Sequence, residues 1–163
     1  MKKKSCFSIK VTELIKYANI SRSTFYIYFD SMFDLIQEME DTFLAGLPDT
    51  KNDRLFNKKE IAECLIFELN YAKKNMYMLQ SFLGPYGDPS FQQKIKNYFI
   101  MSYEKELKKI IRYTSDVEKE LFFKYNSGGR WQIYWWWIFN DCKISIEDMY
   151  RVIMKIIGQF IIK

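Results

Sequence analysis

The first 30 residues contain two short runs in which apolar side chains recur at helical spacing. Between Val11 and Ala18 the apolar residues stand at positions 11, 14, 15 and 18, which is the spacing of one buried helix face. Asn19 interrupts this run, and asparagine tolerates the left-handed backbone of a tight turn. Ser21 is a suitable N-cap for a second short helix, in which Phe25 and Phe29 share one face. The pattern predicts two short helices joined by a tight turn.

The other face of the second predicted helix has a different chemistry. It holds a guanidinium, a hydroxyl, a phenol and one branched apolar group, on Arg22, Ser23, Tyr26 and Ile27. Two short helices with such an outer face are typical of a helix-turn-helix protein that reads the major groove of DNA.

The net charge of the chain is concentrated in the same region. Residues 1–29 hold six of the 25 basic side chains and one of the 20 acidic ones, so residues 30–163 hold 19 of each. The formal net charge of +5 therefore lies at the predicted DNA-binding end, where it would attract phosphates. A solvated basic N-terminus on an ordinary helical domain is the alternative, and the helix-turn-helix spacing favours DNA binding.

The segment ANISRSTFYIYFDSMFDL (18–35) resembles the signature of TetR-type (TetR/AcrR family) transcriptional regulators, AGISxxTFYxYFxSKxDL. The resemblance implies an all-α fold with a DNA-binding head and a helical body. It also implies base contacts from Arg22, Ser23, Tyr26 and Ile27, phosphate contacts from Thr24 and Tyr28, and further DNA contacts from Lys10 and Thr12. For Tyr28, packing within the protein is the alternative.

Two departures from the family pattern affect the expected DNA binding. Met32 stands where the family has a lysine that contacts a phosphate. Only residues 1–8 precede the two predicted helices, so most of the first helix of the family's DNA-binding domain is expected to be missing, together with the layer that covers Leu14, Phe25 and Phe29. We therefore expect this chain to bind DNA weakly and mostly without sequence preference.

The rest of the chain also has helical periodicity, with no long stretch that alternates at period two. Helices are expected over 31–47, 58–74, 75–83, 90–112, 116–140 and 146–162, with loops at 48–57 and 84–90. Ser31, Ser90 and Ser145 are the expected N-caps. The polar stretch 48–57 predicts a boundary between a DNA-binding domain (1–47, truncated at its N-terminus) and a dimerisation and ligand-binding domain (48–163).

Two of these helices carry buried faces that the spacing identifies. The helix 31–47 is expected to bury one side, which comprises Phe33, Leu35, Ile36, Met39, Phe43 and Leu47. The helix 58–74 is expected to bury a stripe of Ile61, Leu65, Leu69 and Ala72. The predicted fold class is therefore all-α and TetR-like.

The last two predicted helices indicate a C2 homodimer. Gly128 and Gly129 lie inside a helix, where each costs about 1 kcal/mol relative to alanine, so close packing of another backbone is an expected compensation. Three adjacent tryptophans, 135–137, cannot share one helix face, so some are expected in the core and some at another subunit. The expected interface comprises Gly128, Gly129, Trp136, Met149, Ile153, Ile156, Ile157 and Phe160.

A ligand cavity is expected among the helices between residues 58 and 140. Aromatic and methionine side chains with few charges would line it and would suit an apolar or aromatic small-molecule effector. Plain core packing of the same side chains is the alternative.

Catalysis and cofactor chemistry have little support. The chain has no histidine and no glycine-rich phosphate loop, so we expect no enzyme, no metal and no cofactor. Its three cysteines are far apart and odd in number, which favours reduced thiols in a cytoplasmic protein. No apolar run reaches the ~18 residues that a membrane span needs, so no membrane partner is expected.

These observations predict a TetR-like transcriptional regulator that binds a palindromic operator in double-stranded DNA as a homodimer and responds to a small molecule. The alternative is a TetR-like dimerisation or partner-binding protein whose DNA binding is impaired.

Overall fold

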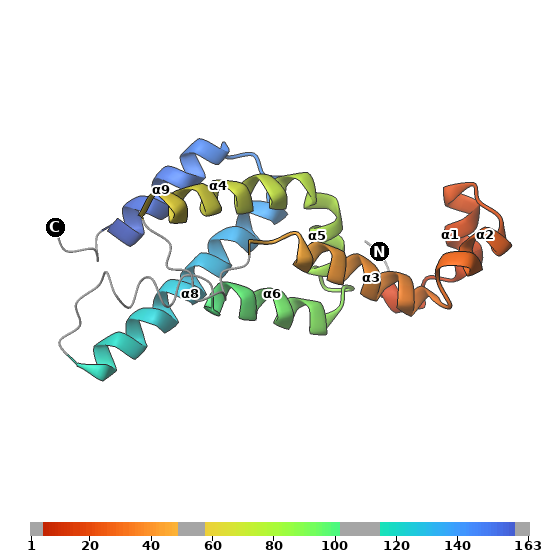
Figure 1. The fold of residues 1–163 in the computed structure, drawn as a ribbon, viewed down its shortest axis with the longest axis horizontal. Coiled ribbons are helices and arrows are strands. Elements are labelled where there is room, and N and C mark those ends of the chain that lie inside the picture. Colours follow the sequence, from red (N-terminus) through yellow and green to blue (C-terminus); the bar gives the residue numbers. More distant parts are fainter. Residues whose placement is uncertain (1–4, 49–57, 102–114, 159–163) are drawn as a thin grey trace. The chain divides into compact units, whose positions relative to one another are not determined.

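The computed structural model of the protein describes residues 5–48, 58–101 and 115–158 (Figure 1). Within these ranges every regular element is a helix, so the fold is all-α, as predicted. The elements are the 3-10 helix η1 (Cys6–Ser8) and the α-helices α1 (Val11–Ala18), α2 (Arg22–Tyr28), α3 (Met32–Ala45), α4 (Lys58–Lys74), α5 (Met76–Phe82), α6 (Pro89–Met101), α8 (Asp116–Phe139) and α9 (Ile146–Gly158).

The chain divides into two compact units. The head unit comprises Met1–Leu47 and Tyr77–Gln93, and the body unit comprises Pro48–Met76 and Lys94–Lys163. Helix α6 therefore begins in the head unit and continues in the body unit.

The turns of the head unit form as the sequence predicts. Helix α1 ends at Asn19, whose backbone is left-handed (φ 53°, ψ 46°). Ser21 caps α2, because its Oγ accepts a hydrogen bond from the Thr24 N–H at 2.9 Å. Ser31 caps α3 in the same way, with the Asp34 N–H at 3.1 Å. These three local signals fix where the first helices begin and end.

The buried face of α3 differs from the predicted one. Ile36, Glu40 and Phe43 are buried, whereas Phe33 and Met39 are 59% and 39% exposed. Positions 36, 40 and 43 are separated by steps of four and three residues, as one helix face requires, so the buried stripe includes the carboxylate of Glu40 and leaves out Phe33 and Met39. Phe33 instead meets Phe7 of η1 at the surface, with their ring centroids 5.8 Å apart.

The prediction that Phe25 lacks a covering layer is wrong. Phe25 is only 2% exposed, and its ring contacts Phe29 at a centroid distance of 5.7 Å. For Leu14 of α1 the expected lack of cover agrees better with the structure. Leu14 is only half-buried, and no side chain of α1 is fully buried. In the same unit, the N–H of the buried Cys6 donates to the Tyr86 carbonyl at 3.0 Å, which ties η1 to the loop before α6.

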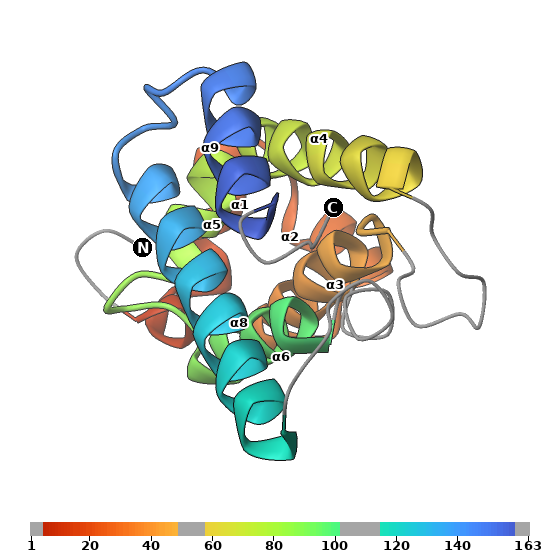
Figure 2. The same cartoon turned by 90° about the vertical axis from the view of Figure 1, so that its left-hand side faces the viewer.

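The body unit is built around α4 and α9, which pack together (Figure 2). The predicted stripe of α4 is buried throughout, namely Ile61, Leu65, Leu69 and Ala72. Trp137 of α8 is completely buried, and its Nε1–H donates to the Ile144 carbonyl at 3.0 Å. Trp136 is 46% exposed and Trp135 is half-buried, so the adjacent tryptophans do point to different surroundings.

The start of α6 corrects a predicted cap. The helix begins at Pro89, and the carboxylate of Asp88 accepts from the Ser90 N–H at 2.7 Å, so Asp88 takes the role predicted for Ser90. Proline favours the first helical position, which places the cap one residue before it. Ser145 takes its predicted role before α9, where its Oγ accepts from the Asp148 N–H at 3.0 Å. The predicted continuation of α6 to residue 112 lies outside the described residues.

Candidate DNA-binding face and effector pocket

Helix α2 presents two opposite faces. Its inner face buries Phe25, and its outer face leaves Ile27 and Tyr28 73% and 72% exposed. Such exposure of large apolar side chains in one short helix indicates a contact surface. The other predicted DNA-contacting side chains are also exposed, except the half-buried Thr24, and they comprise Lys10, Thr12, Arg22, Ser23 and Tyr26.

Interactions within the helix organise part of this face. The Arg22 guanidinium lies 5.5 Å from the centre of the Tyr26 ring, which is within the range of a cation–π interaction. The two residues are one helical turn apart. The Ser21 hydroxyl lies 2.8 Å from the Ser23 hydroxyl and 2.7 Å from the Thr24 hydroxyl. The cap of α2 and two of the predicted DNA contacts therefore share one hydrogen-bond network.

Helix α8 has an exposed apolar stripe in the body unit. Val117, Leu121 and Tyr125 are 67%, 60% and 69% exposed and recur every four residues, and Trp136 continues this side. A Cβ added at Gly128 or Gly129 would meet no heavy atom within 4 Å. Among the residues that the structure describes, none therefore packs against the glycine pair.

The residues predicted for a dimer interface have separate locations. Gly128, Gly129 and Trp136 are exposed on α8, whereas Met149 and Ile153 of α9 are 4% and 1% exposed within a single chain. Because α9 packs against α4, Met149 and Ile153 are covered within their own chain. Ile156 is half-buried, and the side chains of Ile157 and Phe160 lie outside the described part of the chain.

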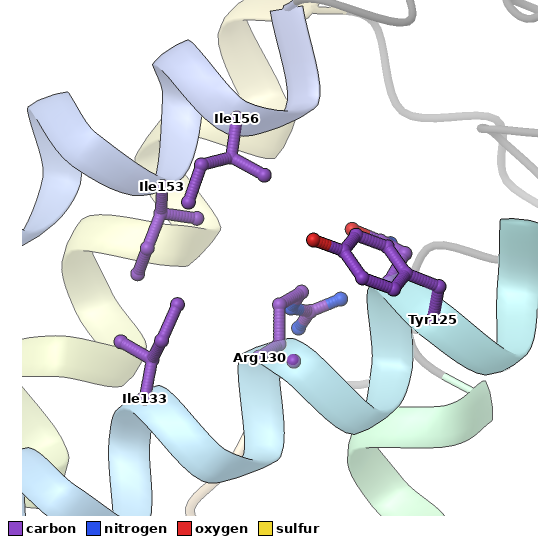
Figure 3. Close-up of a pocket in the computed structure, with 7 residues that line it drawn as sticks. Tyr125, Arg130, Ile133, Ile153 and Ile156 are labelled. Carbon is purple, nitrogen blue, oxygen red and sulfur yellow. The ribbon is translucent and has the colours of Figure 1, made fainter.

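A pocket of about 70 Å³ lies between α8 and α9 (Figure 3). Its walls are Tyr125, Asn126, Gly129, Arg130, Ile133, Ile153 and Ile156. Ile153 and Ile156 of α9 face Ile133 and Arg130 of α8 across the space (Figure 3). This pocket differs from the expected one, because isoleucines and one buried cation line it instead of several aromatic and methionine side chains.

A polar cluster is buried behind Arg130. Glu68 of α4 and Arg130 of α8 are 1% and 4% exposed. The Tyr98 hydroxyl donates to Glu68 Oε1 at 2.7 Å, and the Tyr134 hydroxyl donates to Glu68 Oε2 at 3.3 Å. Arg130 Nη2 lies 4.0 Å from Glu68 Oε2, and the guanidinium lies 5.6 Å from the centre of the Phe99 ring. Three helices, α4, α6 and α8, thus contribute to one charged centre.

Burial keeps both tyrosines of this cluster protonated. It raises the pKa of Tyr98 and of Tyr134 far above the ordinary value for tyrosine, and the negative charge of Glu68 raises the pKa of each further. The two hydroxyls therefore act as stable donors to the carboxylate. This cluster was not predicted from the sequence, although Glu68 lies three residues after Leu65 and four before Ala72, which places it on the buried face of the same helix.

Several other functional groups can be placed within residues 5–48, 58–101 and 115–158. None of the three cysteines forms a disulfide, and burial raises the pKa of the Cys142 thiol to about 11. No cluster of three or more cysteine, aspartate or glutamate side chains in these ranges could hold a metal ion. None of the helices in them is both long enough and apolar enough to cross a membrane.

The chain belongs to the TetR transcriptional regulators. The family model for the transcriptional regulator C-terminal region of this group matches residues 59–159. A solved structure named dihydroxyacetone kinase operon activator DhaS is similar over 98% of this chain and 88% of its own, with a TM-score of 0.61 and 23% sequence identity, which shows a shared fold. No curated protein matches the chain. The resemblance of residues 18–35 to the TetR signature is thus joined by a match over the body.

Proposed function

We propose that this TetR-type regulator binds operator DNA as a homodimer and that a small molecule bound in its body modulates the binding. Residues 1–47 would form the DNA-binding domain and 48–163 the dimerisation and effector-binding domain. The observation that carries the proposal is the outer face of α2, where Arg22, Tyr26, Ile27 and Tyr28 are exposed beside a buried Phe25. The basic N-terminal region adds phosphate attraction to this face.

Fluorescence anisotropy with a labelled palindromic duplex from the protein's own promoter region tests DNA binding. Arg22→Ala should lower the affinity about tenfold or more, because a side chain that reads a base edge contributes about 1–3 kcal/mol. The matched control is Arg151→Ala, which removes an exposed arginine of the body and should leave the affinity unchanged. Equal losses for the two variants would contradict the proposed face.

The homodimer is proposed to form through the exposed stripe of α8. The stripe combines apolar side chains with the open backbone of Gly128 and Gly129, which allows another helix to approach closely. Met149 and Ile153 are no longer part of the proposed interface, because their own chain buries them.

Light scattering with a matched pair of variants tests the dimer. Tyr125→Glu should produce a monomer at micromolar concentration, because it places a charge in the stripe. Tyr77→Glu replaces an equally exposed tyrosine of the head unit and should remain dimeric, since Tyr77 and Tyr125 are 74% and 69% exposed. A wild-type protein that is monomeric at micromolar concentration would contradict the proposed homodimer.

A second candidate function is a TetR-like dimerisation or partner-binding protein with impaired DNA binding. It is favoured by α1, which buries none of its side chains, and by Met32 at the position of the family's phosphate-binding lysine. Unlabelled nonspecific DNA that competes as well as the promoter duplex would support this candidate. A cytoplasmic location belongs to both candidates, since operator DNA and reduced cysteines are found there.

A further inference from the structure

The outer face of α2 carries one side chain that is suited to reading a base directly. Arg22 is exposed, and it is the only residue between positions 20 and 29 with a basic or amide side chain. In the major groove arginine matches guanine, whose O6 and N7 accept two parallel hydrogen bonds. The residue types that match adenine or cytosine, namely asparagine, glutamine, aspartate and glutamate, are absent from this stretch of the sequence.

The stability of α2 does not explain the position of Arg22. It is the first residue of the helix, where the positive end of the helix dipole disfavours a cation, and the first turn holds no acidic side chain. In the described part of the chain, its guanidinium lies against an aromatic ring and pairs with no carboxylate. The N–H groups that point away from this ring therefore remain available to a partner outside the chain.

Tyr26 holds this guanidinium from one side. Its ring centre lies 5.5 Å from the guanidinium, and its ring meets that of the buried Phe25 at 89°, with the two centroids 5.3 Å apart. Tyr26 is 44% exposed, whereas Tyr28 of the same helix is 72% exposed. Part of the Tyr26 ring is thus covered by its own chain, and these contacts connect Arg22 to the buried side of α2.

We propose that Arg22 reads a guanine in the operator half-site and that Tyr26 is a positioning residue, which orients the guanidinium and does not itself read a base. The planar fork of arginine has five N–H donors, so the guanidinium can contact the ring and a base edge together. The ring also restricts a long flexible side chain before DNA binds, so less conformational freedom is lost on binding.

This inference rests on the proposed operator binding through α2 and names the base that the helix reads. It also changes the role expected for Tyr26, because the resemblance to the family implies a base contact from that residue. The difference between the two roles can be measured.

The first experiment is selection of duplexes from a random-sequence library by the full chain, so that no operator has to be known in advance. The wild-type protein should enrich a motif with one guanine at a fixed position of each half-site. Arg22→Ala and Arg22→Lys should both lose the preference for that guanine, because lysine keeps the charge but lacks the planar fork. Arg151→Ala, at an exposed arginine of the body, should keep it. A motif whose guanine survives Arg22→Ala would overturn the assignment.

Replacement of one atom of the selected duplex measures the same contact without a protein variant. A 7-deazaguanine at the enriched position lacks the N7 acceptor, and it should weaken binding of the wild-type chain about tenfold in fluorescence anisotropy. If Arg22 bound a phosphate instead, this replacement would have no effect and Arg22→Ala would weaken binding to all duplexes equally. That result would refute the reading of guanine.

Variants of Tyr26 separate positioning from direct contact, with the ratio of affinities for the guanine and 7-deazaguanine duplexes as the readout. Tyr26→Phe retains the ring and should keep the ratio, whereas Tyr26→Leu should lower it about two- to fivefold. Tyr17→Leu removes a 93% exposed ring of α1 and should leave it unchanged. An equal loss for Tyr26→Phe and Tyr26→Leu, or no loss for Tyr26→Leu, would refute the positioning role.

The ratio compares two duplexes on one protein, so a variant that only folds less well does not change it. The library selection also distinguishes a failure of this inference from a failure of the proposed function. A wild-type chain that enriches no sequence contradicts the operator binding itself. A chain that enriches a motif without a guanine that depends on Arg22 retains the operator binding and loses this assignment.

Discussion

The head unit exposes the side chains of its candidate contact face, whereas the body unit buries a charged cluster. In the head unit, α2 exposes Ile27 and Tyr28 and α1 has no fully buried side chain. In the body unit, Glu68 and Arg130 are almost completely buried among aromatic rings. The candidate contact groups of the head are therefore open to solvent, whereas the charged groups of the body cluster are shielded from it.

The difference in burial between the two units indicates which substitutions should change recognition and which should change stability. An exposed side chain contributes little to folding, so it can be changed for recognition with little effect on stability. A buried ion pair is different, because removal of one partner leaves an uncompensated charge in the core. We therefore expect substitutions in the head face to change DNA binding and substitutions in the body cluster to change the free energy of unfolding.

The largest expected effect is that of Glu68→Leu. It leaves Arg130 buried without its carboxylate and removes the acceptor of Tyr98 and Tyr134, which should lower the free energy of unfolding by about 3–5 kcal/mol. Urea denaturation followed by circular dichroism measures the change.

The control for Glu68→Leu is Glu63→Leu, which breaks an exposed pair with Lys59 in the same helix. This variant should change the free energy of unfolding by less than about 0.5 kcal/mol. Equal stability of the two variants would contradict the expectation that the buried cluster contributes more to folding than an exposed ion pair.

Gly87→Ala should have the next largest effect, and it lies in the head unit. A Cβ at position 87 would lie 1.9 Å from the Phe82 carbonyl oxygen, so the backbone of the loop before α6 would have to move. We expect a loss of about 3 kcal/mol, at the upper end of overpacking effects. Thermal unfolding of the variant provides the measurement.

Gly128→Ala in the body unit is the matched substitution for Gly87→Ala. Its Cβ meets no heavy atom of the described residues within 4 Å, so the variant should gain up to about 1 kcal/mol of helix stability in the isolated chain. It should also weaken the dimer if a partner helix approaches this glycine. A clear loss of stability in the monomer would show that the open side of α8 is packed within its own chain.

Met32→Lys tests the head face with a smaller effect. The new cation at the start of α3 should strengthen DNA binding and steepen the salt dependence by roughly 0.9 in slope, as for one additional phosphate contact. Stability should change by less than about 0.5 kcal/mol. Met101→Lys, at a 52% exposed methionine of α6, adds the same charge in the body unit and should leave the slope unchanged.

The smallest effect is expected for Asp141→Gly in the turn between α8 and α9. Asp141 and Cys142 both have a left-handed backbone, with φ values of 56° and 48°. Glycine adopts this conformation without a steric penalty, so the variant should be more stable by up to about 1 kcal/mol. Differential scanning calorimetry can detect this gain, and Lys143→Gly, just outside the left-handed pair, should show none.

Local sequence signals were enough to predict most of the helical boundaries. Asn19, Ser21 and Ser31 act through hydrogen bonds and backbone preferences that span only a few residues, so their effects do not depend on distant parts of the chain. The same holds for the stripe of α4, because helical spacing alone identifies a buried face. The predicted cap at Ser90 was wrong because the preference of Pro89 for the first helical position outweighs a serine cap at the next residue.

The sequence by itself therefore determined the all-α class, the helix-turn-helix face and the TetR-like assignment. The tertiary structure decided which apolar side chains remain exposed, because Met149 and Ile153 of α9 are buried whereas Leu121 and Tyr125 of α8 are not. It alone brought Glu68 together with Tyr98 and Tyr134 and placed Arg130 in the wall of a pocket. These residues lie on three helices, and no short-range preference specifies a contact between side chains 30 or 66 positions apart, such as those of Glu68 with Tyr98 and with Tyr134.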